Sequence, residues 1–543
     1  MRNPAHPHLV RPARSLLALL AGCLLCTSAI AAPVQGGYRS MDYPELGLSL
    51  RIPKNYEQVP LQPDERWKVL FFSDKPKRAR TKKQEEEYAK NEFGVATLAV
   101  VWIDWAPDPE PKEGAPPAGS DRRTSASGEE KGPKLPITTI ERFIDQEMVG
   151  WTVDGWQTGK EVDGMSGRLT DLTFESQGSS GERGFVYAFK DDARTIAFIG
   201  MAHGSEFDDQ RGIWTSIAEK ADIGEPEKPD LEKWIRYYGN KRYRQVDFRV
   251  GVRSKMVRGW EAEDLDDYIV VYHTKDQPLL KQICRNLEAI RKVYIELFPP
   301  AGELDAVSTV RICRDEDEYL RYAGLEGTAG YWNFMTEELV LYDAAISEKG
   351  QRPKDDNTFI ILYHEAFHQY IYYSAGNVSP HPWYNEGFGD YFSGAEIKGG
   401  KFRRIDINPW RIHTIKDAVE KRTEVAWKDI IRYEQREYYA NPYLCYAQGW
   451  SMIYFLNHAS AVKENERWSR ILQIYFDTIK RVNAEKMAAL KEAGIDKEMG
   501  YVFGAQKEAR DAAVDAAFEG VDLDAIHAAW REFVAGIDWE PGD

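Results

Sequence analysis

Two histidines, the glutamate beside one of them and a second glutamate further along could together hold and use a metal ion. His364 and His368 are four residues apart in a segment, residues 358–373, whose apolar residues predict a helix. Residues at this separation project from one face of a helix, so both imidazoles could bind one ion. Glu386 could supply a third ligand, and Glu365 could act as the general base on a metal-bound water. Three protein ligands and one open position are typical of catalytic zinc, so we expect one Zn²⁺ per chain.

A second interpretation is an ordinary helix that carries two surface histidines. Against it, six apolar residues surround the motif, and burial of imidazoles and a carboxylate among them would cost free energy. These apolar residues are Phe359, Ile360, Ile361, Leu362, Phe367 and Ile371. Residues 381–390 predict a loop that leads into a second helix, and Asp390 lies one helical turn after Glu386. Asp390 could therefore accept a hydrogen bond from the outer N–H of a ligating histidine, and we favour the metal site.

The motif His364-Glu-Ala-Phe-His368, followed by Glu386, is similar to that of the gluzincins, the metallopeptidase clan of thermolysin and the zinc aminopeptidases. The phrase Trp383-Tyr-Asn-Glu-Gly-Phe-Gly-Asp-Tyr-Phe392 resembles more closely a bacterial peptidase-MA-like family of uncharacterised secreted proteins. The resemblance covers roughly residues 265–540. It implies a zinc metallopeptidase in which His364, His368 and Glu386 bind zinc, Glu365 is the base and Asp390 orients a ligand. It also implies a small sheet followed by a helical lobe, with the metal between them.

A tyrosine near the start of a later apolar segment is the candidate for stabilising the oxyanion of the reaction. Tyr446-Ala-Gln-Gly resembles a Tyr-x-x-Gly setting of the aminopeptidases, in which the tyrosine hydrogen-bonds the tetrahedral intermediate. An ordinary aromatic residue at a helix start is the other interpretation, and Tyr443 and His413 are lesser candidates. No Gly-x-Met-Glu-Asn run, the aminopeptidase motif for a free amine, precedes His364. Endopeptidase action is therefore as good an expectation as aminopeptidase action.

We expect a zinc-dependent metallopeptidase that hydrolyses peptide bonds of a peptide or protein substrate. Two alternatives stay open. One is a zinc hydrolase of another amide, such as one in cell-wall peptide. The other is a non-catalytic binding protein on a peptidase scaffold, although the intact Glu365 argues against it, because a decayed site would usually lose its base first. Residues 330–342 predict a hairpin, and its second strand could be the sheet edge on which an extended peptide lies.

The first 32 residues predict a secretory signal peptide, with three arginines, an apolar stretch and small residues before a cleavage point. The predicted location is therefore extracytoplasmic, either periplasmic or secreted. Leu20-Ala-Gly-Cys23 resembles a lipobox, but the apolar run continues after Cys23, so a lipid anchor there is the less favoured alternative. Signal removal would take the formal net charge from −16 to −19, which does not favour nucleic acid as a partner. No second apolar segment is long enough to span a membrane.

The chain of 543 residues predicts an α+β protein with more than one domain. Residues 37–225 predict an accessory domain with an antiparallel sheet and packed helices, which resembles the PsbP-like domain, and residues 106–136 predict a disordered insertion within it. Residues 226–264 predict a linker and a strand-rich connector whose basic and aromatic residues are an alternative nucleic-acid patch. Residues 265–543 predict the gluzincin-like metallopeptidase domain, with a small mixed sheet, zinc-binding helices and a helical C-terminal lobe.

Individual elements follow from hydrophobic periodicity. In the first domain, strands are predicted at residues 47–53, 93–105, 168–176, 185–189 and 195–202, and helices at 139–150 and 207–220. In the last domain, strands are predicted at 267–273, 307–313 and 401–407, and helices at 278–298 and 316–323. Three cysteines remain after signal removal. Cys284 and Cys313 are the likelier disulfide pair by proximity in sequence, although connectivity does not follow from sequence.

Overall fold

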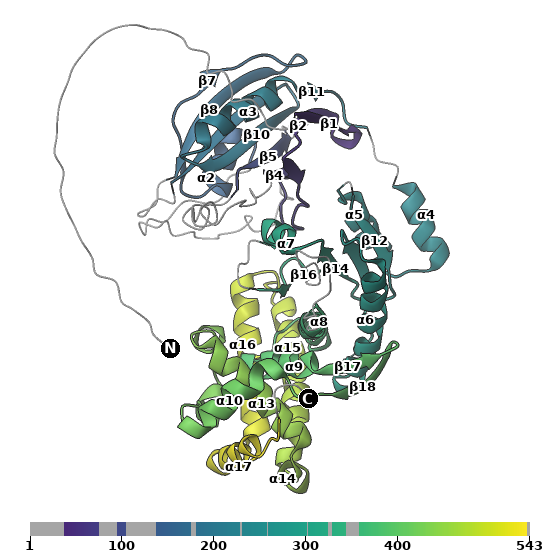
Figure 1. Cartoon of the computed structure of the whole chain (residues 1–543), viewed down its shortest axis with the longest axis vertical. Coiled ribbons are helices and arrows are strands. Elements are labelled where there is room, and N and C mark those ends of the chain that lie inside the picture. Colours follow the sequence, from purple (N-terminus) through teal and green to yellow (C-terminus); the bar gives the residue numbers. More distant parts are fainter. Residues whose placement is uncertain are drawn as a thin grey trace, which may run out of the picture.

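The computed structural model of the protein describes residues 37–74, 95–104, 137–174, 181–227, 231–257, 259–300, 302–323, 328–343 and 358–539. These residues form an α+β fold in which antiparallel sheets make up the N-terminal part and helices make up most of the C-terminal part (Figure 1). The predicted fold class is therefore confirmed. The predicted signal peptide, with Cys23, and the predicted disordered insertion at 106–136 lie outside the described residues.

An eight-stranded antiparallel sheet dominates the N-terminal part, in the order β3-β4-β5-β10-β9-β8-β6, with β7 paired to β8. Its strands are β3 (Tyr56–Gln58), β4 (Lys68–Asp74), β5 (Thr97–Asp104), β6 (Trp151–Val153), β7 (Gln157–Thr158), β8 (Ser166–Phe174), β9 (Glu182–Lys190) and β10 (Arg194–His203). A smaller sheet pairs β2 (Leu48–Pro53) with β1 (Tyr38–Tyr43) and β11 (Asp222–Ile223), and the turn η1 (Pro44–Leu46) joins β1 to β2.

Each face of the large sheet is covered by one helix. Along β5, Leu98 and Val100 belong to the apolar cluster that includes residues of α3 (Phe207–Glu219), while Ala99 and Val101 belong to the cluster that includes residues of α2 (Ile140–Glu147). Successive side chains of a strand point to opposite faces, so this alternation places the two helices on opposite sides. The strands and helices predicted for this domain are present, with ends shifted by a few residues.

The predicted strand-rich connector is wrong, because residues 232–254 form two helices, α4 (Glu232–Lys241) and α5 (Val246–Ser254). Arg249 of α5 is completely buried, and its guanidinium donates to Asp264 Oδ1 at 3.1 Å and to backbone carbonyls. Arg253 donates to the other oxygen of Asp264 at 2.6 Å. These two basic side chains are therefore neutralised inside the protein, which weakens the alternative of a nucleic-acid patch.

A five-stranded mixed sheet begins the part of the chain that carries the candidate metal ligands, in the order β12-β13-β14-β16-β15. Its strands are β12 (Glu261–Asp264), β13 (Tyr268–Tyr272), β14 (Ser308–Cys313), β15 (Gly330–Asn333) and β16 (Glu338–Tyr342), and α6 (Gln277–Leu297) and α7 (Glu316–Ala323) connect them. The predicted hairpin is confirmed, but its second strand is not an edge. Strand β16 pairs with both β14 and β15, so the edge strand on this side is β15.

Two helices, α8 (Thr358–Ser374) and α9 (Pro382–Ser393), pack against each other and carry the candidate metal ligands. The hairpin of β17 (Ala395–Lys398) and β18 (Lys401–Ile405) follows. The remaining helices form the C-terminal lobe seen at the bottom of Figure 1. They are α10 (Pro409–Lys421), α11 (Trp427–Ile430), α12 (Gln435–Tyr438), α13 (Pro442–His458), α14 (Ser460–Glu464), η2 (Trp468–Arg470), α15 (Ile471–Glu492), α16 (Met499–Phe518) and α17 (Leu523–Ala535).

One apolar core joins the five-stranded sheet to these helices, from Tyr268 of β13 to Trp530 of α17. The N-terminal sheet contacts the same part of the chain through Gln62, which donates to the carbonyl of Tyr322 at 2.7 Å, and through Glu57, which accepts from Arg321 at 3.0 Å. Among the described residues, no helix is long and apolar enough to cross a membrane.

Candidate metal centre

Helices α8 and α9 are joined by a short connection, and local sequence accounts for the end of α8 and for the start of α9. Gly376 adopts a positive φ of 84° two residues after α8 ends, which is the conformation that terminates helices and suits glycine. Helix α9 starts at Pro382, since proline needs no partner for its missing N–H at a first helical position. The predicted loop over residues 381–390 is therefore wrong, because only residues 375–381 connect the helices.

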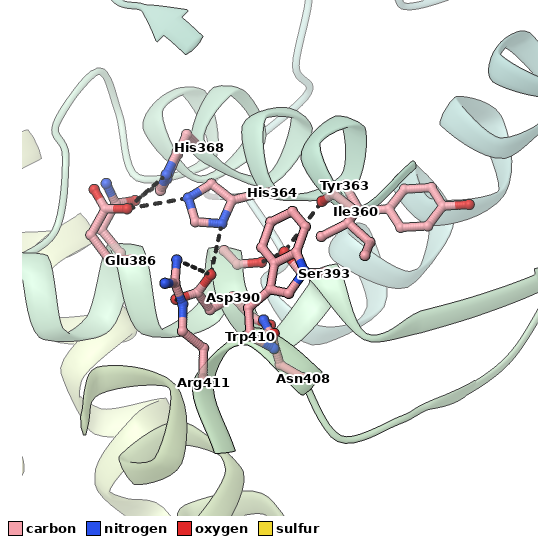
Figure 2. Close-up of polar contacts among 12 residues, drawn as sticks. Ile360, Tyr363, His364, His368, Glu386, Asp390, Ser393, Asn408, Trp410 and Arg411 are labelled. Carbon is pink, nitrogen blue, oxygen red and sulfur yellow. Dashed lines mark hydrogen bonds and ion pairs between the residues drawn. The ribbon is translucent and has the colours of Figure 1, made fainter. Parts of the chain in front are cut away.

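The three predicted ligands meet between α8 and α9. Nε2 of His364 and Nε2 of His368 each lie 3.2 Å from Oε2 of Glu386 (Figure 2). One ligand atom from each of the three residues lies within 4.8 Å of the others. His368 and Glu386 are buried, and the His364 side chain is 13 % exposed. The sequence-predicted ligand set thus forms one compact cluster.

The outer nitrogens of both imidazoles are engaged, which leaves the inner nitrogens for a metal. Nδ1 of His364 faces Asp390 Oδ1 at 3.4 Å, and Nδ1 of His368 faces the amide oxygen of Asn385 at 3.1 Å. Because these oxygens accept hydrogen bonds, each Nδ1 donates a proton outward, and each Nε2 is directed at the centre of the cluster, where a metal ion could displace its proton and take its lone pair. Metal-binding histidines are commonly held in this way, so the donor set fits a zinc ion.

Asp390 itself is fixed by an arginine from helix α10. Arg411 donates from Nε to Oδ2 at 2.6 Å and from Nη2 to Oδ1 at 3.2 Å (Figure 2). Such paired contacts are geometrically specific. Asn408 also donates to the backbone carbonyl of Asp390 at 3.0 Å. The predicted role of Asp390, orienting the first histidine, therefore has a structural basis that includes Arg411.

The electrostatics of the cluster favour positive charge at its centre. Burial by itself would lower the pKa of His364, but hydrogen bonds to Asp390 and Glu386 outweigh burial and raise that pKa to about 10. Burial would also lower the pKa of His368, but the negative charge of Glu386 outweighs it and raises that pKa. Burial would raise the pKa of Glu386, but the two histidines hold it well below its usual range. The carboxylates thus favour a cation here, either as protons or as a metal ion.

Glu365 projects from the same helix as the two histidines and is partly exposed. Among the described residues it has no hydrogen-bond partner, so its carboxylate is available as a base. Its charge makes a minor contribution to the raised pKa values of Tyr439 and Tyr446.

Tyr446 lies beside the cluster, in the second turn of α13 and not at the start of the helix. Its ring stacks on the ring of His364 with centroids 6.4 Å apart, and the Arg411 guanidinium lies 4.9 Å from its centroid. Burial, with a contribution from Glu386, raises the pKa of Tyr446 well above its ordinary value. The hydroxyl therefore stays protonated and can donate. Of the lesser candidates, Tyr443 is 81 % exposed and His413 packs against Trp539.

A second tyrosine, Tyr439, contacts a candidate ligand directly. Its hydroxyl donates to Oε1 of Glu386 at 2.7 Å, while Oε2 of Glu386 faces the histidines. The residue as a whole is 41 % exposed, but its hydroxyl end reaches the buried carboxylate. The rings of Tyr439 and Tyr446 stack with centroids 6.1 Å apart. Tyr439 thus holds Glu386 in place and connects it to the candidate oxyanion donor.

Two glycines on α9 permit the close approach of its neighbours. A Cβ atom at Gly389 would lie 2.8–2.9 Å from three ring atoms of His364. A Cβ atom at Gly387 would lie 2.7 Å from the carbonyl oxygen of Gly449 on α13. Within the Glu-Gly-Phe-Gly-Asp phrase, Gly389 therefore lets α9 approach His364, and Gly387 lets it approach α13.

Sequence reasoning missed Arg411, Asn385 and Tyr439. Asn385 directly precedes the predicted ligand Glu386. Its amide oxygen could have been predicted to accept a hydrogen bond from one of the two histidines. Arg411 and Tyr439 come from other helices, and nothing in their local sequence marks them, because their roles depend on how α10 and the end of α12 pack on α9.

Residues 359–474 match the model of a protein family described as "Protein of unknown function (DUF1570)". This stretch contains the three predicted ligands, Glu365 and Tyr446. No curated protein matches the sequence.

Two solved structures are similar to part of the chain. The solution structure of cyanobacterial PsbP (CyanoP) from Synechocystis sp. PCC 6803 is 11 % identical with a TM-score of 0.23, covering 38 % of this chain and 99 % of that one. The protein of unknown function PA94 from Pseudomonas aeruginosa, titled a putative regulator, is 8 % identical with a TM-score of 0.17, covering 35 % and 100 %. Likenesses at these TM-scores carry no argument about fold or function.

Proposed function

We propose that the protein is a zinc metallopeptidase. The observation that supports this most is the convergence of His364 Nε2, His368 Nε2 and Glu386 Oε2, with the outer nitrogen of each imidazole already hydrogen-bonded. Two imidazoles and one carboxylate are the ligand set of several zinc peptidases, and they leave one position open. We also propose export from the cytoplasm, on the basis of the N-terminal segment.

The residues divide into three roles. His364, His368 and Glu386 would hold the ion, with Asp390, Asn385 and Tyr439 fixing their orientation. Zinc bound there would lower the pKa of water towards about 7 and polarise a carbonyl group. Glu365 takes a proton from the attacking water and passes it to the leaving amine. Tyr446 donates a hydrogen bond to the oxygen of the former carbonyl, where negative charge develops.

A conservative change at the base tests the proposal. Glu365→Gln keeps the shape of the side chain but cannot take a proton, so zinc content should stay at one ion in this site while peptide cleavage falls by about 10²–10⁴-fold. Metal is measured by elemental analysis and cleavage with a peptide library. The exposed Glu420→Gln on α10 is the matched control and should leave both unchanged.

The other outcomes separate the alternatives. Full cleavage by Glu365→Gln would show that the assigned base is wrong. A different result would favour the zinc hydrolase of another amide. In that case His364→Ala loses its zinc, and the wild type cleaves no peptide of the library but releases amide products from cell-wall peptide. No metal at these residues, even after zinc is supplied, would favour a non-catalytic binding protein.

A further inference from the structure

A second group of metal-ligating side chains lies at the opposite end of helix α9 from Asp390. His381 caps the start of α9, Glu434 precedes α12, and Asp511 lies on α16. One nitrogen or oxygen atom from each of them lies within 4.8 Å of the others. None of these residues belongs to the zinc cluster of His364, and no role in the proposed reaction uses them.

Two of the three inward atoms have no hydrogen-bond partner although they are buried. His381 is 1 % exposed, its Nε2 makes no hydrogen bond, and the nearest carboxylate oxygen, Oδ1 of Asp511, is 3.9 Å away. Oε1 of Glu434 is buried and likewise makes no hydrogen bond. Buried polar atoms without a partner cost free energy and call for an explanation. Here both of them, from separate elements, belong to the same small group.

The outward atoms of the same residues are all engaged. Nδ1 of His381 faces the hydroxyl of Tyr475 at 3.1 Å. Arg510 donates to Oε2 of Glu434 at 3.0 Å, and Lys507 donates to Oδ2 of Asp511 at 2.8 Å. Each of the three side chains is therefore held from outside, while its inner atom faces the shared space. The cluster around His364 has the same arrangement, with engaged outer atoms and convergent inner ones.

We propose that His381 Nε2, Glu434 Oε1 and Asp511 Oδ1 form a second site for a divalent metal ion, of which zinc is the best match. An imidazole with two carboxylates suits Zn²⁺ among the biological divalent ions. Bound there, an ion would satisfy both unpartnered atoms at once. Solvent can reach the site, because the side chains of Asp511 and Glu434 are 43 % and 34 % exposed.

Two cations compete with the ion for these carboxylates. Arg510 contacts the outer oxygen of Glu434, and Lys507 lies 3.9 Å from its inner oxygen. The Lys507 side chain is 55 % exposed, so its ammonium group can move into solvent when an ion enters. Removal of this lysine charge should therefore strengthen metal binding.

The second site would act on the first through two short stretches of chain. His381 is five residues before Glu386 on α9, and Glu434 is five residues before Tyr439. Glu386 and Tyr439 are joined by a hydrogen bond of 2.7 Å. An ion that holds the starts of α9 and α12 together would therefore also fix Glu386 and Tyr439 relative to each other. The site is structural, and its existence does not depend on the proposed peptidase activity.

The experiment titrates the purified protein, freed of metal by a chelator, with Zn²⁺ alone in a calorimeter. We expect two Zn²⁺ per chain in the wild type and one in the double variant His364→Ala/His368→Ala. Addition of Asp511→Asn to the double variant should weaken binding by at least about tenfold and abolish the rise in Tm that Zn²⁺ causes. Addition of Lys507→Met should instead tighten binding.

Asp515→Asn is the matched control, because Asp515 lies one turn further along α16 and pairs with Arg432 on the surface. Asp511→Asn and Asp515→Asn are each added to the double variant and compared. Equal zinc affinity of these two proteins would overturn the proposal, and so would a double variant that binds no zinc. If the double variant does not fold, Asp511→Asn in the wild type decides, with an expected fall from two ions to one. A further outcome is that the wild type binds only one ion. If Asp511→Asn loses this ion and His364→Ala/His368→Ala keeps it, the result supports the second site and overturns the catalytic one.

Discussion

Two stacked tyrosines next to the candidate metal ligands have hydroxyl groups in different surroundings. Tyr439 donates to the candidate ligand Glu386, whereas Tyr446 stacks with His364 and makes no hydrogen bond to a carboxylate of the described residues. The raised pKa of each keeps both hydroxyls protonated, first through burial and then through Glu386. Removal of the Tyr439 hydroxyl should therefore weaken zinc binding, whereas removal of the Tyr446 hydroxyl should slow the reaction.

We expect Tyr446→Phe to lower kcat by about 10²–10³-fold with little change in zinc affinity, as is typical for loss of one oxyanion donor. Tyr439→Phe should instead weaken zinc binding by about 10–100-fold, because a partner of a metal ligand is lost, and excess zinc should restore kcat. Steady-state kinetics at several zinc concentrations separate the two. Tyr443→Phe, at an 81 % exposed position, is the control. Equal kcat for Tyr446→Phe and Tyr443→Phe would remove Tyr446 from the mechanism.

At the scale of elements, the contact between α8 and α9 depends on Gly389. Alanine is the better helix former by about 1 kcal/mol, so propensity alone predicts that Gly389→Ala stabilises α9. The new Cβ, however, would lie 2.8–2.9 Å from three ring atoms of His364, and a shift of this ring would break its contact with Asp390. We expect the steric effect to win, with a loss of zinc from this site and a destabilisation of about 1–3 kcal/mol.

A helical glycine in open surroundings is the matched control for that prediction. No atom lies within 4 Å of a Cβ placed at Gly504 of α16. Gly504→Ala should therefore raise the free energy of unfolding by about 1 kcal/mol and leave zinc binding unchanged. Denaturant unfolding and elemental analysis measure both effects. If Gly389→Ala bound zinc as tightly as the wild type, α9 would have to sit further from His364 than the structure places it.

The sequence was sufficient for those features that depend on local spacing. The two histidines on one face of α8, and Asp390 one turn beyond Glu386, follow from helical periodicity, whereas Glu386 was assigned from its place in the motif and the start of α9 was predicted as a loop. Features that depend on residues far apart in the chain were missed or wrong. Residues 226–264 were predicted as a linker and strand-rich connector, but residues 232–254 form two helices, and the buried pair of Arg249 with Asp264 joins residues 15 positions apart without a local signal. The sheet edge was assigned to β16 because the parallel pairing of β16 with β14 has no local signal.

At the scale of the whole molecule, three buried cysteines lie in the sheet and helices that carry the candidate metal site, so their reactivity measures how closely this part is packed. Cys284 of α6, Cys313 of β14 and Cys445 of α13 are all buried free thiols. The expected pairing of Cys284 with Cys313 is therefore not present. Cys284 and Cys445 belong to the apolar core that joins the sheet to the helices, and Cys313 belongs to a second apolar cluster that includes strands of the same sheet. Protection of all three thiols therefore requires both clusters to be folded.

Burial raises the pKa of all three thiols, to about 12 for Cys284, to about 11 for Cys445 and well above the ordinary value for Cys313. Because the thiolate is the reactive form, the native protein without its predicted signal should react with a thiol reagent at pH 8 at least about a hundredfold more slowly than the unfolded chain. The folded state favours protonated thiols, so their contribution to stability is present below the ordinary thiol pKa and declines as pH rises above it. In denaturant without reductant, three thiols per chain should react. One reactive thiol under those conditions would mean that two cysteines are paired, and fast reaction of all three in the native protein would mean that the sheet and the helical lobe open readily.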